Sequence, residues 1–191
     1  MAELSPMMQQ YLEIKRQHPN EILFYRVGDF YEMFFDDALT ASRELEITLT
    51  GRDCGQEERA PMCGVPYHAC DIYLNKLIEK GYKVAICEQM EDPKLAKGIV
   101  KREVIRIVTP GTNMSQAILD ETRNNYLMCI FGCNDEYGVA VCDITTGEFR
   151  SCHISSTSKL YDEINKYSPT EIIGNGTFLS CDLNFDYMKE K

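Results

Sequence analysis

The sequence lacks any apolar run of about 18 residues, the length that a helix needs to cross a membrane, so no transmembrane helix is expected. Residues 1–6 contain neither a basic region nor an apolar stretch, so no secretory signal peptide is expected. A Gly-x-x-x-x-Gly-Lys-[Ser/Thr] phosphate-binding loop is missing too, and ATP hydrolysis by that route is therefore not expected of this chain. These absences indicate a cytoplasmic protein that does not contact a membrane.

Metal-ligand spacing is also missing. The three histidines, His18, His68 and His153, lie far apart in the sequence. The nine cysteines are odd in number and irregularly spaced, and no two of them form a Cys-x-x-Cys motif. We therefore expect reduced thiols that pack as small apolar residues, with no metal or other cofactor bound by this chain.

Positive charge is scarce, since 20 Lys and Arg stand against 30 Asp and Glu, for a net charge of −10. Phosphate contacts need Lys and Arg, so the chain by itself should not bind a nucleic-acid duplex tightly. Residues 1–111 carry 14 basic and 18 acidic side chains, and residues 112–191 carry 6 and 12. The first part can still touch DNA locally through a basic stretch formed by Lys94, Lys97, Lys101, Arg102 and Arg106.

The most informative run is residues 28–35, Gly-Asp-Phe-Tyr-Glu-Met-Phe-Phe. In an extended segment Phe30 and Glu32 project to the same face, whereas Tyr31 and Met33 point the other way. An apolar wedge beside one hydrogen-bonding group suits a protein that opens a base step in DNA. The alternative is that Phe30 packs in the core, because residues 24–35 contain six aromatic side chains.

Five further blocks, in order, surround this run: residues 6–12 (PMMQQYL), 22–29 (ILFYRVGD), 59–68 (RAPMCGVPYH), 84–89 (VAICEQ) and 106–112 (RIVTPGT). Together they closely resemble the amino-terminal, mismatch-recognition domain of the MutS family of DNA mismatch-repair proteins. Residues 113–191 are similar to the start of that family's connector domain, with weaker motifs.

The expected fold class is α/β. Periodicity predicts helices at 6–18, 36–46 and 69–80 and strands at 21–27, 47–50, 82–89 and 103–109. Pro61 and Pro66 argue against a central strand in the segment that contains them.

The resemblance implies a mixed-sheet mismatch-recognition domain with about three helices at 1–112, a linker at 113–124 and a connector domain at 125–191. Strands at 126–131, 137–144, 148–153 and 171–174 and a helix at 158–167 fit the opening of a ribonuclease-H-like fold. That fold would be incomplete, so we expect a fragment of a longer chain.

The resemblance also implies the site. Phe30 would insert at a mispaired step from the minor groove, and Glu32 would form a hydrogen bond with a mispaired base, its pKa raised by burial and by nearby phosphates. Further candidate contacts with the DNA backbone or groove are Arg52, Pro66, His68, Lys97, Lys101 and Arg102.

The partners implied are double-stranded DNA with mismatches or small unpaired loops, a second copy of the parent protein, and a MutL-like repair protein that contacts the connector. The parent would be an ATP-dependent mismatch sensor whose ATP and Mg²⁺ bind in a domain absent from this chain.

Two alternatives concern the second half. Ribonuclease-H-like nucleases place carboxylates on their first strands to hold two divalent metals. Of Asp143 and Glu148, only Asp143 lies at a suitable position, and the acidic residues expected on later elements are missing. The acidic second half could instead serve as a docking surface for partner proteins.

Overall fold

The structure is a computed structural model that describes residues 4–96, 98–113, 124–134 and 136–179. Contacts between residues divide the chain between Thr109 and Pro110 into two compact units. The expected linker at 113–124 lies, apart from its two end residues, outside the described residues. The domain boundaries that we expected from the sequence therefore stay a prediction.

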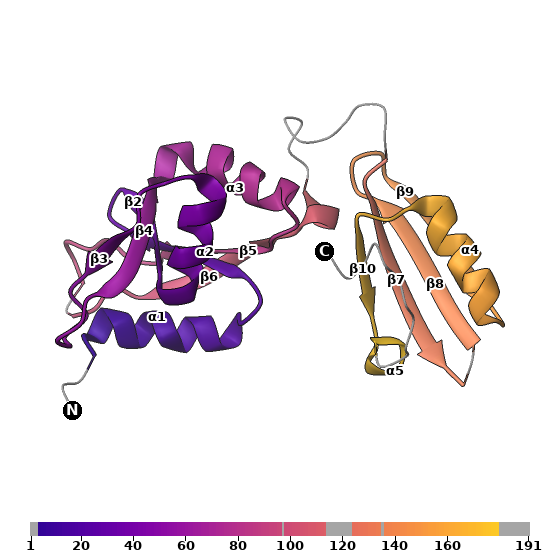
Figure 1. The fold of residues 1–191 in the computed structure, drawn as a ribbon, viewed down its shortest axis with the longest axis horizontal. Helices are drawn as coiled ribbons and strands as arrows, with labels where there is room; N and C mark the ends of the chain where they lie inside the picture. The colour runs from indigo at the N-terminus through magenta and orange to yellow at the C-terminus, as the bar shows by residue number, and fades with distance from the viewer. Residues whose placement is uncertain (1–3, 97, 114–123, 135, 180–191) are drawn as a thin grey trace. The chain divides into compact units, whose positions relative to one another are not determined.

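The first unit is a six-stranded mixed sheet with helices on its faces (Figure 1). Its elements are α1 (Pro6–Gln17), β1 (Ile22–Val27), β2 (Phe30–Phe34), α2 (Phe35–Leu45), β3 (Thr50–Arg52), β4 (Ala60–Pro66), the 3₁₀ helix η1 (Tyr67–Ala69), α3 (Cys70–Glu79), β5 (Val84–Gln89) and β6 (Arg102–Val108). The strand order is β3-β4-β2-β1-β5-β6, with β1 parallel to β5 and the other neighbouring pairs antiparallel. The expected α/β fold with a mixed sheet is confirmed.

Alternation along β1 builds a core on each face of this sheet. Tyr25 lies against Tyr11 of α1, with their ring centroids 5.4 Å apart. Phe24 points to the opposite face and lies 5.9 Å from the ring of Tyr31. Since Glu32 is directly opposite Tyr25 in the ladder, it belongs to the α1 face, and Tyr31 belongs to the other.

Two expectations for this unit are wrong. The segment with Pro61 and Pro66 forms β4, which lies inside the sheet between β3 and β2. The sheet tolerates these prolines because they are the second and last residues of β4, so the four residues between them keep their backbone donors. The strand expected at 47–50 lies instead at Thr50–Arg52, so only Thr50 is common to the expected and the observed strand.

The second unit is a four-stranded mixed sheet with one long helix. It contains the 3₁₀ helix η2 (Pro110–Thr112), β7 (Tyr126–Cys133), β8 (Glu136–Asp143), β9 (Glu148–Ile154), α4 (Thr157–Tyr167), β10 (Glu171–Gly174) and the short α5 (Gly176–Leu179). The strand order is β10-β7-β8-β9, and only β10 is parallel to its neighbour. Three antiparallel strands, a helix and a fourth strand follow one another as expected, and the structure shows that the fourth strand is parallel to β7. Leu160 and Ile164 of α4 pack on this sheet in the core.

Candidate nucleic-acid interface

Phe30 begins β2 directly after a tight turn. Val27 and Phe30 close this turn, so Gly28 and Asp29 form its tip. Gly28 has a φ of +57°, a left-handed conformation that glycine adopts without strain. The Phe30 side chain is 46% exposed, whereas Tyr31 is buried. Phe30 is therefore not a core residue, and its ring stands on the surface at the end of a hairpin.

Glu32 lies two residues farther along the same strand, and Arg52 of β3 forms an ion pair with its carboxylate. The Glu32 side chain is only 13% exposed. Burial raises the pKa of the Glu32 carboxyl above its ordinary value, and the positive charge of Arg52 offsets that effect only in part. A carboxyl with a raised pKa is more easily protonated, so it can either accept or donate a hydrogen bond.

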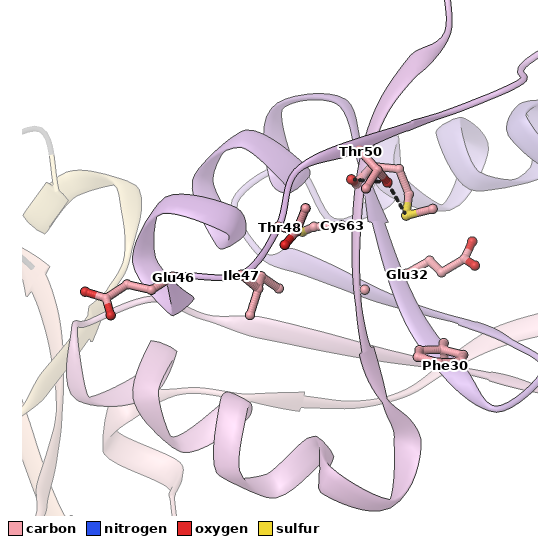
Figure 2. Close-up of a pocket in the computed structure, with 9 residues that line it drawn as sticks. Phe30, Glu32, Glu46, Ile47, Thr48, Thr50 and Cys63 are labelled. Atoms are coloured by element: carbon pink, nitrogen blue, oxygen red, sulfur yellow. Dashed lines mark hydrogen bonds between the residues drawn. The ribbon is translucent and has the colours of Figure 1, made fainter.

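Both side chains border an open hollow of about 610 Å³ (Figure 2). Gly64 of β4 is opposite Glu32, and a Cβ at that position would lie 3.3 Å from the backbone oxygen of Tyr31 and 3.5 Å from Glu32 Cγ. Ile47 lines another part of the same hollow. The glycine thus keeps space beside the carboxylate that a larger residue would reduce.

Arg26 and Tyr67 lie next to the turn that precedes Phe30, and the sequence analysis did not single them out. The Arg26 guanidinium lies 3.9 Å from the centroid of the Tyr67 ring. Tyr67 is 46% exposed and follows Pro66, which pairs with Phe30 in the β2–β4 ladder. The proximity of Arg26 to Gly28 in the sequence was the one available signal, and it does not reveal the contact with Tyr67.

The other candidate contact residues fall into three groups. Pro66, which pairs with Phe30 across the ladder, is half-buried, and His68, two residues later in η1, is exposed. Lys101 is exposed and forms an ion pair with Glu103, at 2.6 Å. Lys97 lies outside the described residues.

Arg102 does not fit the expectation of a phosphate contact. Its side chain is 9% exposed, and its guanidinium donates to the backbone oxygen of Arg26 at 2.7 Å and to Gln10 Oε1 at 3.1 Å. It also stacks on the ring of Tyr25, 4.8 Å from the centroid. Because these donors are used inside the fold, Arg102 connects β6 to β1 and α1.

The two carboxylates considered as metal ligands are both engaged by neighbours. Asp143 is buried, and it accepts hydrogen bonds from the Thr145 backbone and hydroxyl at 2.9 and 2.6 Å. Burial raises the pKa of Asp143, but these bonds and others from Thr146 and Asn125 bring it below the ordinary value. Glu148 accepts from the Tyr126 hydroxyl at 3.0 Å. Within the described residues, no group of three or more His, Cys, Asp or Glu side chains could bind a metal ion.

Comparison with known proteins gives matches over nearly the whole chain. A family model described as MutS domain I matches residues 5–117, and one described as MutS domain II matches residues 125–186. The DNA mismatch repair protein MutS of Lachnoclostridium phytofermentans is 63% identical over 191 residues, which are 100% of this chain and 20% of that protein. The protein of the same description from Acetivibrio thermocellus is 67% identical over 181 residues, covering 93% of this chain and 21% of its own length.

The chain thus spans about a fifth of the length of the curated relatives that it matches. In the part of the chain that the structure describes, no helix combines the length and the apolar character needed to cross a membrane.

Proposed function

The chain belongs to the MutS family, and on that premise we propose that its first domain recognises mispaired or unpaired nucleotides in double-stranded DNA. The observation that carries this proposal is the position of Phe30 at the end of a hairpin, with nearly half of its surface exposed and a carboxylate two residues later on the same face of the strand. An exposed aromatic ring on a rigid sheet can enter a base stack without unfolding its own domain.

Phe30 acts as a wedge in this proposal. Its ring inserts from the minor groove at the mispaired step and stacks on one base, which kinks the duplex. Unstacking a base step costs about a few kcal/mol, and least where pairing is already defective. Recognition therefore depends on how easily the DNA deforms, which allows one side chain to serve several mismatches and small unpaired loops.

Glu32 tests the pair that Phe30 has opened. A carboxylate near phosphates is repelled, so its presence is favourable only where it gains a hydrogen bond to a base. The raised pKa of Glu32 in the free protein makes the protonated form, and hence a bond to a base acceptor, more accessible. On fully paired DNA this hydrogen bond is absent while the repulsion remains, and matched duplex is bound less well.

Residues around the wedge supply the contacts that do not depend on sequence. Of the candidates, His68 and Lys101 are exposed, and Pro66 is opposite Phe30 in the ladder. Arg52 can contact a phosphate when Glu32 turns to the DNA. Such contacts position the protein on the duplex and raise its affinity without changing its preference.

We propose further that the chain is the amino-terminal region of a longer, ATP-dependent mismatch sensor. The support is that the relatives are about five times longer and that this sequence has no phosphate-binding loop. ATP and Mg²⁺ would then bind in a domain outside this chain. The full-length protein would act as a homodimer in which one subunit inserts its wedge, and the second domain would contact a MutL-like repair protein.

The experiment measures binding of the full-length protein to a duplex with one G·T mispair and to the fully paired duplex, in competition. Phe30→Ala should reduce the preference for the mispair by roughly 5- to 150-fold, which corresponds to a stacking contribution of about 1–3 kcal/mol. Phe149→Ala is the matched control, since it removes an aromatic ring that is 68% exposed on the second domain. An equal loss of affinity for both duplexes in Phe30→Ala would make Phe30 a general contact and refute the sensing role.

A further inference from the structure

Arg26 lies on β1 directly opposite Tyr31, and its side chain does not extend into solvent. The guanidinium lies 3.9 Å from the ring centroid of Tyr67 and 5.5 Å from that of Tyr31. Its Nε donates a hydrogen bond to the backbone oxygen of Gly28. The side chain is 16% exposed, so most of the cation is covered by these neighbours.

The charge of Arg26 is balanced by Glu88 of β5. Nη1 of Arg26 lies 3.5 Å from Glu88 Oε1, and the Tyr31 hydroxyl donates a hydrogen bond to the same oxygen. A cation that already has a carboxylate partner attracts a phosphate less than a free one does. Arg26 is therefore better placed to connect parts of the domain than to bind the DNA backbone.

The connected parts are the two segments that flank Phe30. The turn at Gly28 and Asp29 comes directly before Phe30, and Pro66, the residue before Tyr67, is its partner across the ladder. The Tyr67 backbone N–H also donates to the Asp29 oxygen at 2.9 Å. Arg26 bonds to the first segment through Gly28 and stacks on the second through Tyr67.

We propose that Arg26 is a positioning residue for mismatch recognition, which fixes the turn before Phe30 against Tyr67 and so sets the direction in which the Phe30 ring projects. This inference rests on the proposed function of Phe30. Arginine suits the task because its planar guanidinium stacks on an aromatic ring while its edge donates hydrogen bonds. A lysine would keep the charge but could not do both, so the turn would gain freedom and the wedge would lose its defined direction.

The test uses the full-length protein with Arg26→Lys, and Arg43→Lys serves as the control because Arg43 is an exposed arginine on α2 with a 72% exposed side chain. Affinities for G·T and fully paired duplexes are measured over a range of salt concentrations. Arg26→Lys should reduce the preference for the mispair about fivefold, which corresponds to one cation–π contact of about 1 kcal/mol. Arg26→Gln, which also removes the charge, should leave the salt dependence unchanged. The fluorescence of a 2-aminopurine base beside the mispair should increase less when Arg26→Lys binds than when wild type binds, because the variant unstacks this base less completely.

A second pair of variants covers the case in which Arg26→Lys unfolds. Tyr67→Leu removes the stacking surface from an exposed position and should reduce the preference, whereas Tyr67→Phe keeps the ring and should retain it. A salt slope that falls by about 0.9 in Arg26→Gln, which removes the charge, would mean that Arg26 contacts a phosphate, and this would overturn the inference. An unchanged preference in both Arg26→Lys and Tyr67→Leu would overturn it while leaving the role of Phe30 intact. A wild-type protein that binds both duplexes equally would overturn the proposed function, and this inference with it.

Discussion

Arg52 of β3 and Glu32 of β2 form an ion pair although a whole strand, β4, lies between their backbones. Arg52 is opposite Ala60 and Glu32 is opposite Gly64, so the two side chains meet diagonally across β4. The carboxylate proposed to test a base pair is thus already satisfied in the free protein. A base must therefore displace Arg52 from the Glu32 carboxylate, and the free energy of the lost ion pair reduces the net gain from the hydrogen bond to the base.

The first prediction concerns this ion pair. Arg52→Gln should destabilise the first domain by about 1 kcal/mol, because it leaves a largely buried carboxylate without its partner, while the part-exposed position of Arg52 limits the loss. Glu32→Gln alone should destabilise the domain less than Arg52→Gln does. In the double variant, most of the stability lost in Arg52→Gln should be recovered. Urea unfolding of wild type, the two single variants and the double variant gives the coupling energy between the two side chains. A value near zero would show that the ion pair makes no net contribution to stability.

The second prediction concerns DNA discrimination by Glu32. Glu32→Gln removes the charge but keeps a group that can form hydrogen bonds, so repulsion from the phosphates disappears on every duplex. Binding to the matched duplex should be retained or increase, and the preference for the mispair should fall by about fivefold. Competition binding measures both quantities. Asp36→Asn, at an exposed position on α2, is the charge-matched control. A discrimination ratio equal to that of wild type would remove Glu32 from the recognition step.

The third prediction is a pH dependence of stability. The folded-state pKa of Glu32 is raised above its ordinary value of 4.5 by burial. The protonated form is therefore favoured in the folded state, and this contribution is fully present below pH 4.5 and is lost as the pH rises through the folded-state pKa. Glu32→Gln does not titrate, so its unfolding free energy relative to wild type should rise with pH over that interval. Unfolding in urea at several pH values from acid to neutral checks this, and the opposite slope would mean that Arg52 outweighs burial.

The fourth prediction concerns the turn before Phe30. Gly28 has a φ of +57° and no atom within 4 Å of the position that a Cβ would occupy, so any effect of Gly28→Ala comes from backbone strain alone. The cost should be about 1–2 kcal/mol. Gly138→Ala is the control, since Gly138 has equal space but no positive φ, and Gly28→Asn should recover part of the loss because asparagine tolerates this conformation. Thermal unfolding of the three variants measures the differences.

The local pattern of residues along the chain was sufficient to predict most helices of this protein and the faces of its strand β2. The alternation of Phe30 and Glu32 with Tyr31 and Met33 predicted which side chains share a face, because side chains on a strand alternate whatever the strand packs against. The spacing of apolar residues predicted α1, α2, α3 and α4 for a similar reason, since each helix has one buried stripe. The ordered motif blocks are sufficient to indicate the family.

Partners distant in the sequence could be identified only from the folded chain. Arg52 and Glu32 are 20 positions apart, and Arg26 and Glu88 are 62 apart, so no local pattern relates the members of either pair. Arg102 belongs to a basic stretch in the sequence, yet the fold turns it inward onto Tyr25 while its neighbour Lys101 stays in solvent. The sequence also did not indicate that β4 lies inside the sheet, because the order of strands depends on which strand edges pair in the folded chain. Charge and burial are properties of a three-dimensional neighbourhood, whereas side-chain alternation is a property of the backbone itself.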